Sequence, residues 1–212
     1  MSLIQTSEIL VLRKSPYGET SMIIAGITPE LGRLDLIIKG GMGGGKTKFP
    51  AADIFRELQV EFSESSQSTL HNLRNAEILG SCGEALAAVP DNFTLAIELA
   101  ALILKWGKPQ LPAPEVYCAA LNVFNQLSMI EVSDRFAEPK RIRCAVMLKL
   151  VLLSENGLLP EYLDRDPDLN VEKHDLMDQI LAAAQGLEDP PQNTARFWHK
   201  MNSWADALFT NT

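Results

Sequence analysis

The spacing of apolar residues changes once along this chain, near residue 80, and the change restricts the folds available to it. Before that point the apolar residues come in short runs separated by turns. The run ELQVEFSE at 57–64 alternates strictly, with Leu58, Val60 and Phe62 on one face. After that point they recur at helical spacing, as in LAIELAALIL at 95–104. Strands that all precede the helices predict an α+β fold, because an α/β sheet alternates the two.

The first part of the chain is expected to form five strands, at 7–13, 20–28, 33–40, 57–64 and 68–79. The turn-forming stretches SPYGE and PELG separate the first three of them. Short strands packed into so few residues indicate a small closed barrel, since closure removes exposed sheet edges. A first domain is therefore expected at 1–80.

The second part is expected to form a helical domain at 81–212. Its helices are predicted at 91–107, 114–127, 138–157, 173–186 and 194–209, with a loop rich in proline and aspartate between 159 and 171. Pro114 suits a first helical turn, and Gly107 and Gly157 suit helix ends. In the last of these helices Trp198 and Trp204 lie on different faces, so one is expected in the core and the other exposed.

The stretch GGMGGGKT at 40–47 satisfies the P-loop pattern with Gly40, Gly45, Lys46 and Thr47. A P-loop must follow a strand and lead at once into a helix whose N-terminal amides hold the phosphates. Here Pro50 follows closely, and the next segment soon becomes an alternating strand. The strands also do not alternate with helices, and no strand ends in an acidic residue suited to magnesium. We therefore interpret the match as fortuitous and expect no nucleotide hydrolysis.

Composition excludes several other classes. With 46% hydrophobic residues among 212, the chain can form packed cores, and its longest apolar runs are too short for a membrane helix. The three cysteines and three histidines are scattered, so no metal site, disulfide framework or catalytic dyad follows from their spacing. We expect no cofactor. We expect the protein to be cytoplasmic. The net charge of −8 is uneven: residues 1–80 hold 8 basic and 9 acidic residues, and the remainder holds 11 and 18.

Four basic residues gather on and beside the glycine-rich stretch: Arg33, Lys39, Lys46 and Lys48. Barrels of the OB type bind single-stranded nucleic acid through a basic groove with aromatic stacking platforms. The alternative is a solvated hairpin loop whose lysines only maintain solubility, which the acidic balance of the whole chain favours.

The N-terminal part resembles that of the RecO family of bacterial recombination mediators. The resemblance is carried by Pro16-Tyr17-Gly18-Glu19-Thr20-Ser21, by Thr28 and Gly32, and by Lys39-Gly40. A further similarity is the pattern L-x-x-A-E that ends the fifth predicted strand, at 73–77. Later, Leu152, Leu153, Gly157 and Pro160 are similar to the family pattern L-L-x-x-x-G-x-x-P. Arg165 and Asp166 stand where many members begin a four-cysteine zinc module, so that module is absent.

The resemblance implies an OB barrel joined to a helical domain, in a protein without enzymatic activity of its own. It implies binding of single- and double-stranded DNA, annealing of complementary strands, and loading of RecA together with RecR onto DNA coated by single-strand-binding protein. RecA and RecF are further candidate partners. The alternative is a protein-interaction adaptor derived from the same family, with weak or no DNA binding.

Two sets of residues follow as candidate sites. For DNA, Arg33, Lys39, Lys46 and Lys48 are expected to contact phosphates, with Arg13, Lys14 and Arg74 at strand ends as further candidates. Tyr17 is a candidate for base stacking, or else a turn aromatic that caps the barrel. For protein contact, Lys140, Arg141 and Arg143 precede the helix that resembles the family site for the acidic tail of single-strand-binding protein. The alternative there is a solvated first helical turn.

Overall fold

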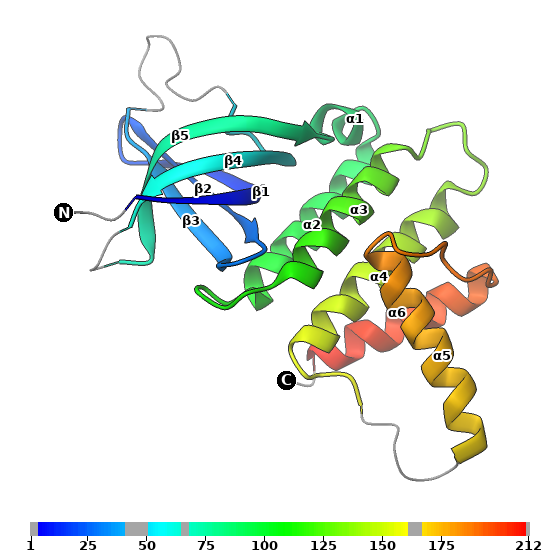
Figure 1. Ribbon diagram of the computed structural model, residues 1–212. Coiled ribbons are helices and arrows are strands. Elements are labelled where there is room, and N and C mark those ends of the chain that lie inside the picture. Colours follow the sequence, from blue (N-terminus) through cyan, green and yellow to red (C-terminus); the bar gives the residue numbers. More distant parts are fainter. Residues whose placement is uncertain (1–3, 41–50, 65–67, 161–166, 211–212) are drawn as a thin grey trace. The chain divides into compact units, whose positions relative to one another are not determined.

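The computed structural model of the chain describes residues 4–40, 51–64, 68–160 and 167–210. Five strands form a closed barrel in the order β1-β2-β3-β5-β4 (Figure 1). Their bounds are β1 Ile4–Tyr17, β2 Ser21–Thr28, β3 Gly32–Ile38, β4 Arg56–Ser63 and β5 Leu70–Ser81. The expected α+β class and five-stranded OB barrel are therefore confirmed.

Closure of the barrel depends on two pairings between strands that are distant in sequence. β1 pairs antiparallel with β4 as well as with β2, and β3 pairs in parallel with β5, where Asp35 lies opposite Leu70. Alternation then sends one set of side chains inward. Ile9, Ile24, Leu36 and Leu58 are all fully buried members of this core.

The chain divides into two compact units, Met1–Tyr117 and Cys118–Thr212. The first unit contains the barrel, the short helix α1 (Gly83–Ala87) and α2 (Pro90–Trp106), which contacts β1 and β2. Leu10 and Ile27 pair in register and are buried without belonging to the inner core. The sequence pattern did not predict α1. Strands give way to helices at Cys82–Gly83, and the expected domain limits, 1–80 and 81–212, stay a prediction.

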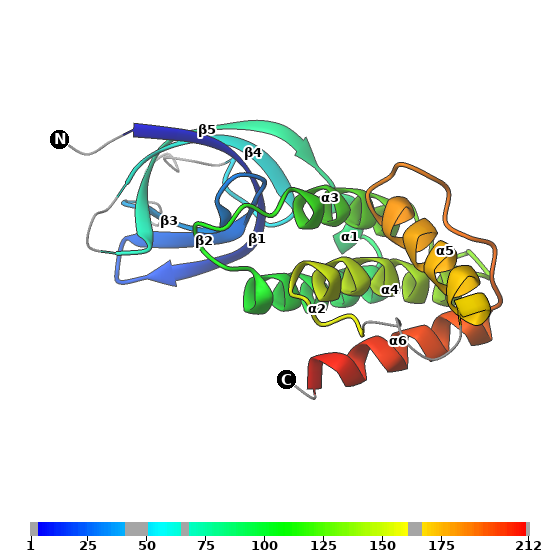
Figure 2. The ribbon, with the colours of Figure 1, turned by 60° about the horizontal axis from the view of Figure 1, so that its bottom comes forward.

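The second unit is built around α4 (Ala137–Glu155), which contacts both α5 (Pro167–Ala184) and α6 (Ala195–Thr210) (Figure 2). Its residues Cys144–Leu148 and Leu150–Leu153 are all buried, as expected of a helix that is apolar on every side. The Asn122 amide, on the part of α3 (Pro114–Ser128) in this unit, donates to the carbonyls of Ala183 and Ala184, each at 3.0 Å. The expectation of a loop up to residue 171 was wrong, because α5 already begins at Pro167.

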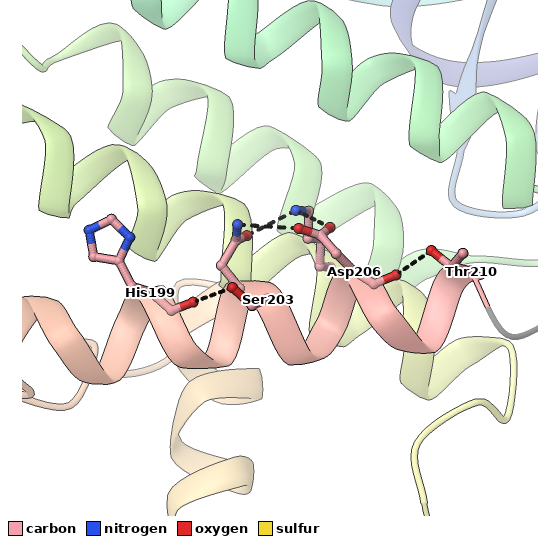
Figure 3. Close-up of polar contacts among 6 residues, drawn as sticks. His199, Ser203, Asp206 and Thr210 are labelled. Carbon is pink, nitrogen blue, oxygen red and sulfur yellow. Dashed lines mark hydrogen bonds and ion pairs between the residues drawn. The ribbon is translucent and has the colours of Figure 1, made fainter.

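A polar network joins α6 to α4. Lys149 of α4 donates to Asn202 at 2.9 Å and pairs with the Asp206 carboxylate at 2.5 Å. Along α6 itself, the Ser203 hydroxyl donates to the His199 carbonyl and the Thr210 hydroxyl to the Asp206 carbonyl (Figure 3). Of the two tryptophans of α6, Trp198 is buried, as expected of one of them, whereas Trp204 is half-buried and not exposed.

Candidate nucleic-acid interface

Tyr17 and Lys39 lie at the same end of the barrel, where β1 turns into β2. Tyr17 pairs with Ser21 across that turn, and the next pair across β2 and β3 is Met22 with Ile38. Lys39 follows Ile38 directly, so it lies beside Ser21. Met22 and Ile38 point into the core, and alternation therefore places Tyr17, Ser21 and Lys39 on the outer face. Tyr17 is 52% exposed, as a stacking residue must be.

Arg74 lies on β5, the strand next to β3. β3 and β5 run parallel, with Ile37 opposite Asn72, so Arg74 follows near the end of β3 that leads into Lys39. Arg74 falls at an irregularity of the β4–β5 register, between Leu73 opposite Phe62 and Asn75 opposite Glu61. It is exposed, and its Nε donates to the Ser63 hydroxyl at 3.2 Å. Lys39 and Arg74 are thus two exposed cations near the same end of β3.

β1 contributes a further cation to the outer face. A bulge after Val11 shifts the register, so that Arg13 pairs with Ala25 and lies exposed on the outside. Lys14 instead pairs with Asp53 at 3.3 Å, across the end of the barrel. Arg13 is therefore the freer of the two adjacent cations.

Between these cations lies a strip that the sequence analysis did not single out. Ile23 and Ile37 pair in register, are half-buried and face outward, with Ser21 beside them. We call Tyr17, Ser21, Ile23, Ile37 and Lys39, flanked by Arg13 and Arg74, the outer β2–β3 face. The apolar strip suits the bases of a single strand of nucleic acid, and the basic edges suit its phosphates. The signal for Ile23 and Ile37 was present in the sequence, as apolar residues at outward positions of the strands.

Arg33 lies away from the outer β2–β3 face, near the opposite end of the barrel. Its Nε and Nη2 donate to the two Asp35 carboxylate oxygens at 3.3 and 2.9 Å, and its Nη1 donates to the Leu104 carbonyl at 3.0 Å. These contacts fix the last turn of α2 to the barrel. The sequence carried a signal for this role, because Asp35 lies two residues away on the same face of one strand. Lys46 and Lys48 lie outside the described residues, as does most of the P-loop match.

The outer surface of β4 and its neighbours is acidic by contrast. Glu61 pairs with Asn75, and Gln59 pairs with Glu77 on one side and Glu8 on the other. Glu61 and Glu77 are exposed. Phosphates are repelled by such a surface, so the electrostatics of the barrel favour the outer β2–β3 face for nucleic acid.

The three basic residues at the start of α4 have different surroundings. Lys140 pairs with Asp134 at 2.5 Å, and Arg141 is half-buried. Arg143 borders a cavity of about 910 Å³, and among the described residues its buried Nε has no hydrogen-bond acceptor. Asn122, Gln126, Trp198, Glu188 and Asp189 also line this cavity.

Two further searches covered only the part of the chain that the structure describes. No group of three or more His, Cys, Asp or Glu side chains there is placed to hold a metal ion. No described helix has both the length and the apolar character needed to cross a membrane.

Comparison with known proteins relates the N-terminal part of the chain to one family. Residues 1–82 match the family described as Recombination protein O N terminal. The chain is thus similar to RecO proteins. It is similar to the DNA repair protein RecO of Alteromonas mediterranea, with 28% identity over 152 residues, covering 72% of this chain and 59% of the relative. RecO of Polynucleobacter necessarius is 29% identical over 147 residues, covering 69% and 57%.

A third relative, RecO of Xanthomonas euvesicatoria, is 30% identical over 116 residues, which cover 54% of this chain and 46% of the relative. The matched part thus spans about half the length of these RecO proteins.

Proposed function

We propose that this RecO-like protein is a DNA repair and recombination mediator that binds single-stranded DNA on its outer β2–β3 face. The observation that carries the proposal is the convergence of Arg13, Lys39 and Arg74 around the apolar strip of Ile23 and Ile37, with Tyr17 exposed at its end. The cations contact phosphates, and Tyr17 stacks on a base. Double-stranded DNA is bound by the same cations through its phosphates alone.

The wider role follows from the family. Holding one strand by its phosphates leaves the base edges free to pair, which favours annealing of a complementary strand. Loading of RecA with RecR, and any contact with RecF, are proposed from the RecO resemblance alone.

The test is fluorescence anisotropy of a labelled single-stranded oligonucleotide at about 50 and 200 mM salt. Three phosphate contacts predict a slope of log K against log salt of about −2. Lys39→Ala and Arg74→Ala each lower the slope by roughly 0.7, and Tyr17→Ala weakens binding by about 1–3 kcal/mol. Lys108→Ala is the matched control, because this exposed lysine lies away from the outer β2–β3 face. Equal losses from Lys108→Ala and Lys39→Ala would contradict the assignment.

Absence of binding at the lower salt concentration, with the protein folded, would favour the adaptor function instead. One observation supports a protein partner independently of DNA. Arg143 borders a cavity and its buried Nε lacks an acceptor among the described residues, and leaving a buried donor unpaired costs about 1–3 kcal/mol. We propose that the C-terminal carboxylate of the single-strand-binding protein tail supplies that acceptor.

Glu188 and Asp189 line the same cavity and oppose an acidic tail. A labelled tail peptide should therefore bind at least about 5-fold more tightly to the Glu188→Gln, Asp189→Asn variant, and about 10-fold more weakly to Arg143→Gln. Lys140→Ala serves as the control, since Asp134 already holds its amine. An unchanged affinity in the Arg143 variant would exclude this site.

A further inference from the structure

The mouth of the barrel opposite the β1–β2 turn is hollow. Gln5 pairs in register with Phe62, and both point inward, as do Leu34 and His71 on β3 and β5. With Glu64 and Thr69 they surround a cavity of about 290 Å³. Apolar side chains fill the barrel interior further in, so the cavity has an apolar floor and a polar rim. Barrel mouths of this kind are frequent sites for small ligands.

The segment that follows α2 forms one wall of this cavity. The backbone N–H of Arg33 donates to the Lys108 carbonyl at 3.2 Å, and the N–H of Gln110 donates to the Leu31 carbonyl at 2.8 Å. Pro109 bridges to Gly32 between these two bonds and borders the cavity. This wall of the cavity is therefore held by main-chain hydrogen bonds.

The polar groups at the rim are only partly satisfied. The Gln5 amide donates one N–H to a Glu64 carboxylate oxygen at 3.0 Å. Among the described residues, no further partner is found for the second N–H and the carbonyl oxygen of Gln5 or for the other oxygen of Glu64. Arg33 also borders the cavity, but Asp35 neutralises its charge. The rim thus offers both donors and acceptors around one uncompensated carboxylate.

These features select the ligand by its chemistry. A phosphate is disfavoured, because Glu64 would repel it. Phe62 and His71, whose ring centroids lie 5.5 Å apart with planes tilted by 42°, border the cavity and give it an aromatic side against which a planar ring can pack. A ring edge that has an amino donor beside a ring acceptor can donate to Glu64 and accept from Gln5, as the edges of cytosine and adenine do. Uracil and thymine have no amino group, and their one donor on that edge, the N3–H, lies between two carbonyl oxygens that the Glu64 carboxylate repels.

We infer that the barrel mouth binds one unpaired, amino-bearing nucleobase. This site goes beyond the outer β2–β3 face and lies at the other end of the barrel. It would give the protein a second contact with single-stranded nucleic acid that depends on base type, whereas the phosphate contacts do not.

The test is a titration of the ¹⁵N-labelled full chain with cytidine and with uridine, followed by ¹H–¹⁵N correlation spectra. Cytidine should shift the side-chain amide of Gln5 and the backbone signals of Thr69, His71 and Gln110, with Kd on the order of 1 mM. Uridine should bind at least about 5-fold more weakly. Glu64→Gln should abolish the preference, because an amide can both donate and accept.

Glu61→Gln is the matched control, since Glu61 lies on the same strand but is exposed on the outer surface. It should leave the cytidine titration unchanged. The inference is overturned if neither nucleoside shifts these signals at about 10 mM. It is equally overturned if uridine binds as tightly as cytidine, or if the shifts fall on Tyr17 and Lys39 instead. Oligonucleotide anisotropy probes the outer face, so each site can fail without the other.

Discussion

The Tyr117 hydroxyl donates to the Glu57 carboxylate at 2.9 Å. This hydrogen bond connects α3 to β4 within the first unit. The Glu8 carboxylate on β1 lies 3.3 Å from the same hydroxyl. One hydroxyl proton therefore serves two carboxylates, on adjacent strands whose residues Leu10 and Glu57 pair in register.

Removal of this hydroxyl should destabilise the protein. Tyr117→Phe leaves two neighbouring carboxylates without their shared donor, and hydrogen bonds to charged groups contribute about 1.5–3 kcal/mol. We expect the free energy of unfolding in urea at neutral pH to fall by an amount in that range. A loss below about 0.5 kcal/mol would show that water replaces the hydroxyl without cost.

The same residue predicts a dependence on pH. Burial, and then the Glu57 carboxylate, raise the pKa of Tyr117 well above its ordinary value. The unfolded chain therefore loses this proton first, at about pH 10, while the folded protein keeps it. Its contribution to stability is complete below about pH 10 and is lost as the pH rises further. Wild-type stability should fall more steeply than that of Tyr117→Phe in this range, and parallel curves would contradict the prediction.

Two glycines with the same backbone conformation should differ sharply on substitution. Gly18 and Gly32 have φ angles of +62° and +61°, so alanine carries the same left-handed penalty at both, about 1–2 kcal/mol. A Cβ at Gly18 meets nothing within 4 Å, whereas one at Gly32 would lie 2.2 Å from the Leu111 carbonyl oxygen. Thermal unfolding should show Gly32→Ala to be at least about 2 kcal/mol less stable than Gly18→Ala.

Arg33 and Lys39 should separate stability from DNA binding. Arg33→Met breaks the contacts to Asp35 and to the Leu104 carbonyl and should lower the free energy of unfolding by about 1–2 kcal/mol. It should change oligonucleotide binding little. Lys39→Ala should do the reverse, since this exposed side chain supports no element of the fold. Fluorescence anisotropy and urea unfolding of both variants test this separation of stability from binding. A loss of oligonucleotide binding in folded Arg33→Met would show that Arg33 contacts phosphate after all.

The Lys149–Asp206 ion pair should contribute little to the free energy of unfolding. Its main effect should be on the local stability of α6. The Lys149 side chain is 13% exposed and that of Asp206 is 51% exposed, so solvent screens the pair from one side. A double-mutant cycle with Lys149→Met and Asp206→Asn should give a coupling of about 0.5–1 kcal/mol. Hydrogen exchange should show lost protection in α6 before α4. A coupling energy near zero would show that apolar packing alone holds α6 against α4.

The three thiols should react in an order set by burial. Cys118 is exposed, whereas burial raises the pKa of Cys82 to about 11 and that of Cys144 to about 12. Thiolates are the reactive form, so a thiol reagent at pH 8 should label Cys118 first and the other two only on unfolding. Cys118→Ser should remove the fast phase. Rapid labelling of Cys144 in the folded protein would contradict its placement.

Local pattern was enough to predict the strands but not the way they close. Alternation in ELQVEFSE placed β4 to within one residue, because burial of one strand face leaves a mark on neighbouring positions. The parallel pairing of β3 with β5 leaves no such mark, since it joins Asp35 to a residue 35 positions away. The five residues of α1 are too few for a helical period to stand out.

The candidate site was predictable only in part for a related reason. Composition drew attention to cations near the glycine-rich stretch, and one of them, Lys39, does share a face with Tyr17. Arg33 was grouped with them by proximity in sequence, whereas strand direction carries it to the far end of the barrel. The Nε of Arg143, which finds no acceptor in the described part of the chain, and the hollow barrel mouth depend on packing between distant elements, which no spacing rule reports.

The closing pairings of the barrel also have a consequence for the nascent chain. When β1, β2 and β3 have emerged from the ribosome, the partners of β1 and β3 on their outer sides, β4 and β5, have yet to emerge. Two sheet edges are then open, and open edges recruit strands from other chains. We expect this window to be the period of greatest aggregation risk during synthesis, and to end when Leu70 meets Asp35 and the last edge is covered.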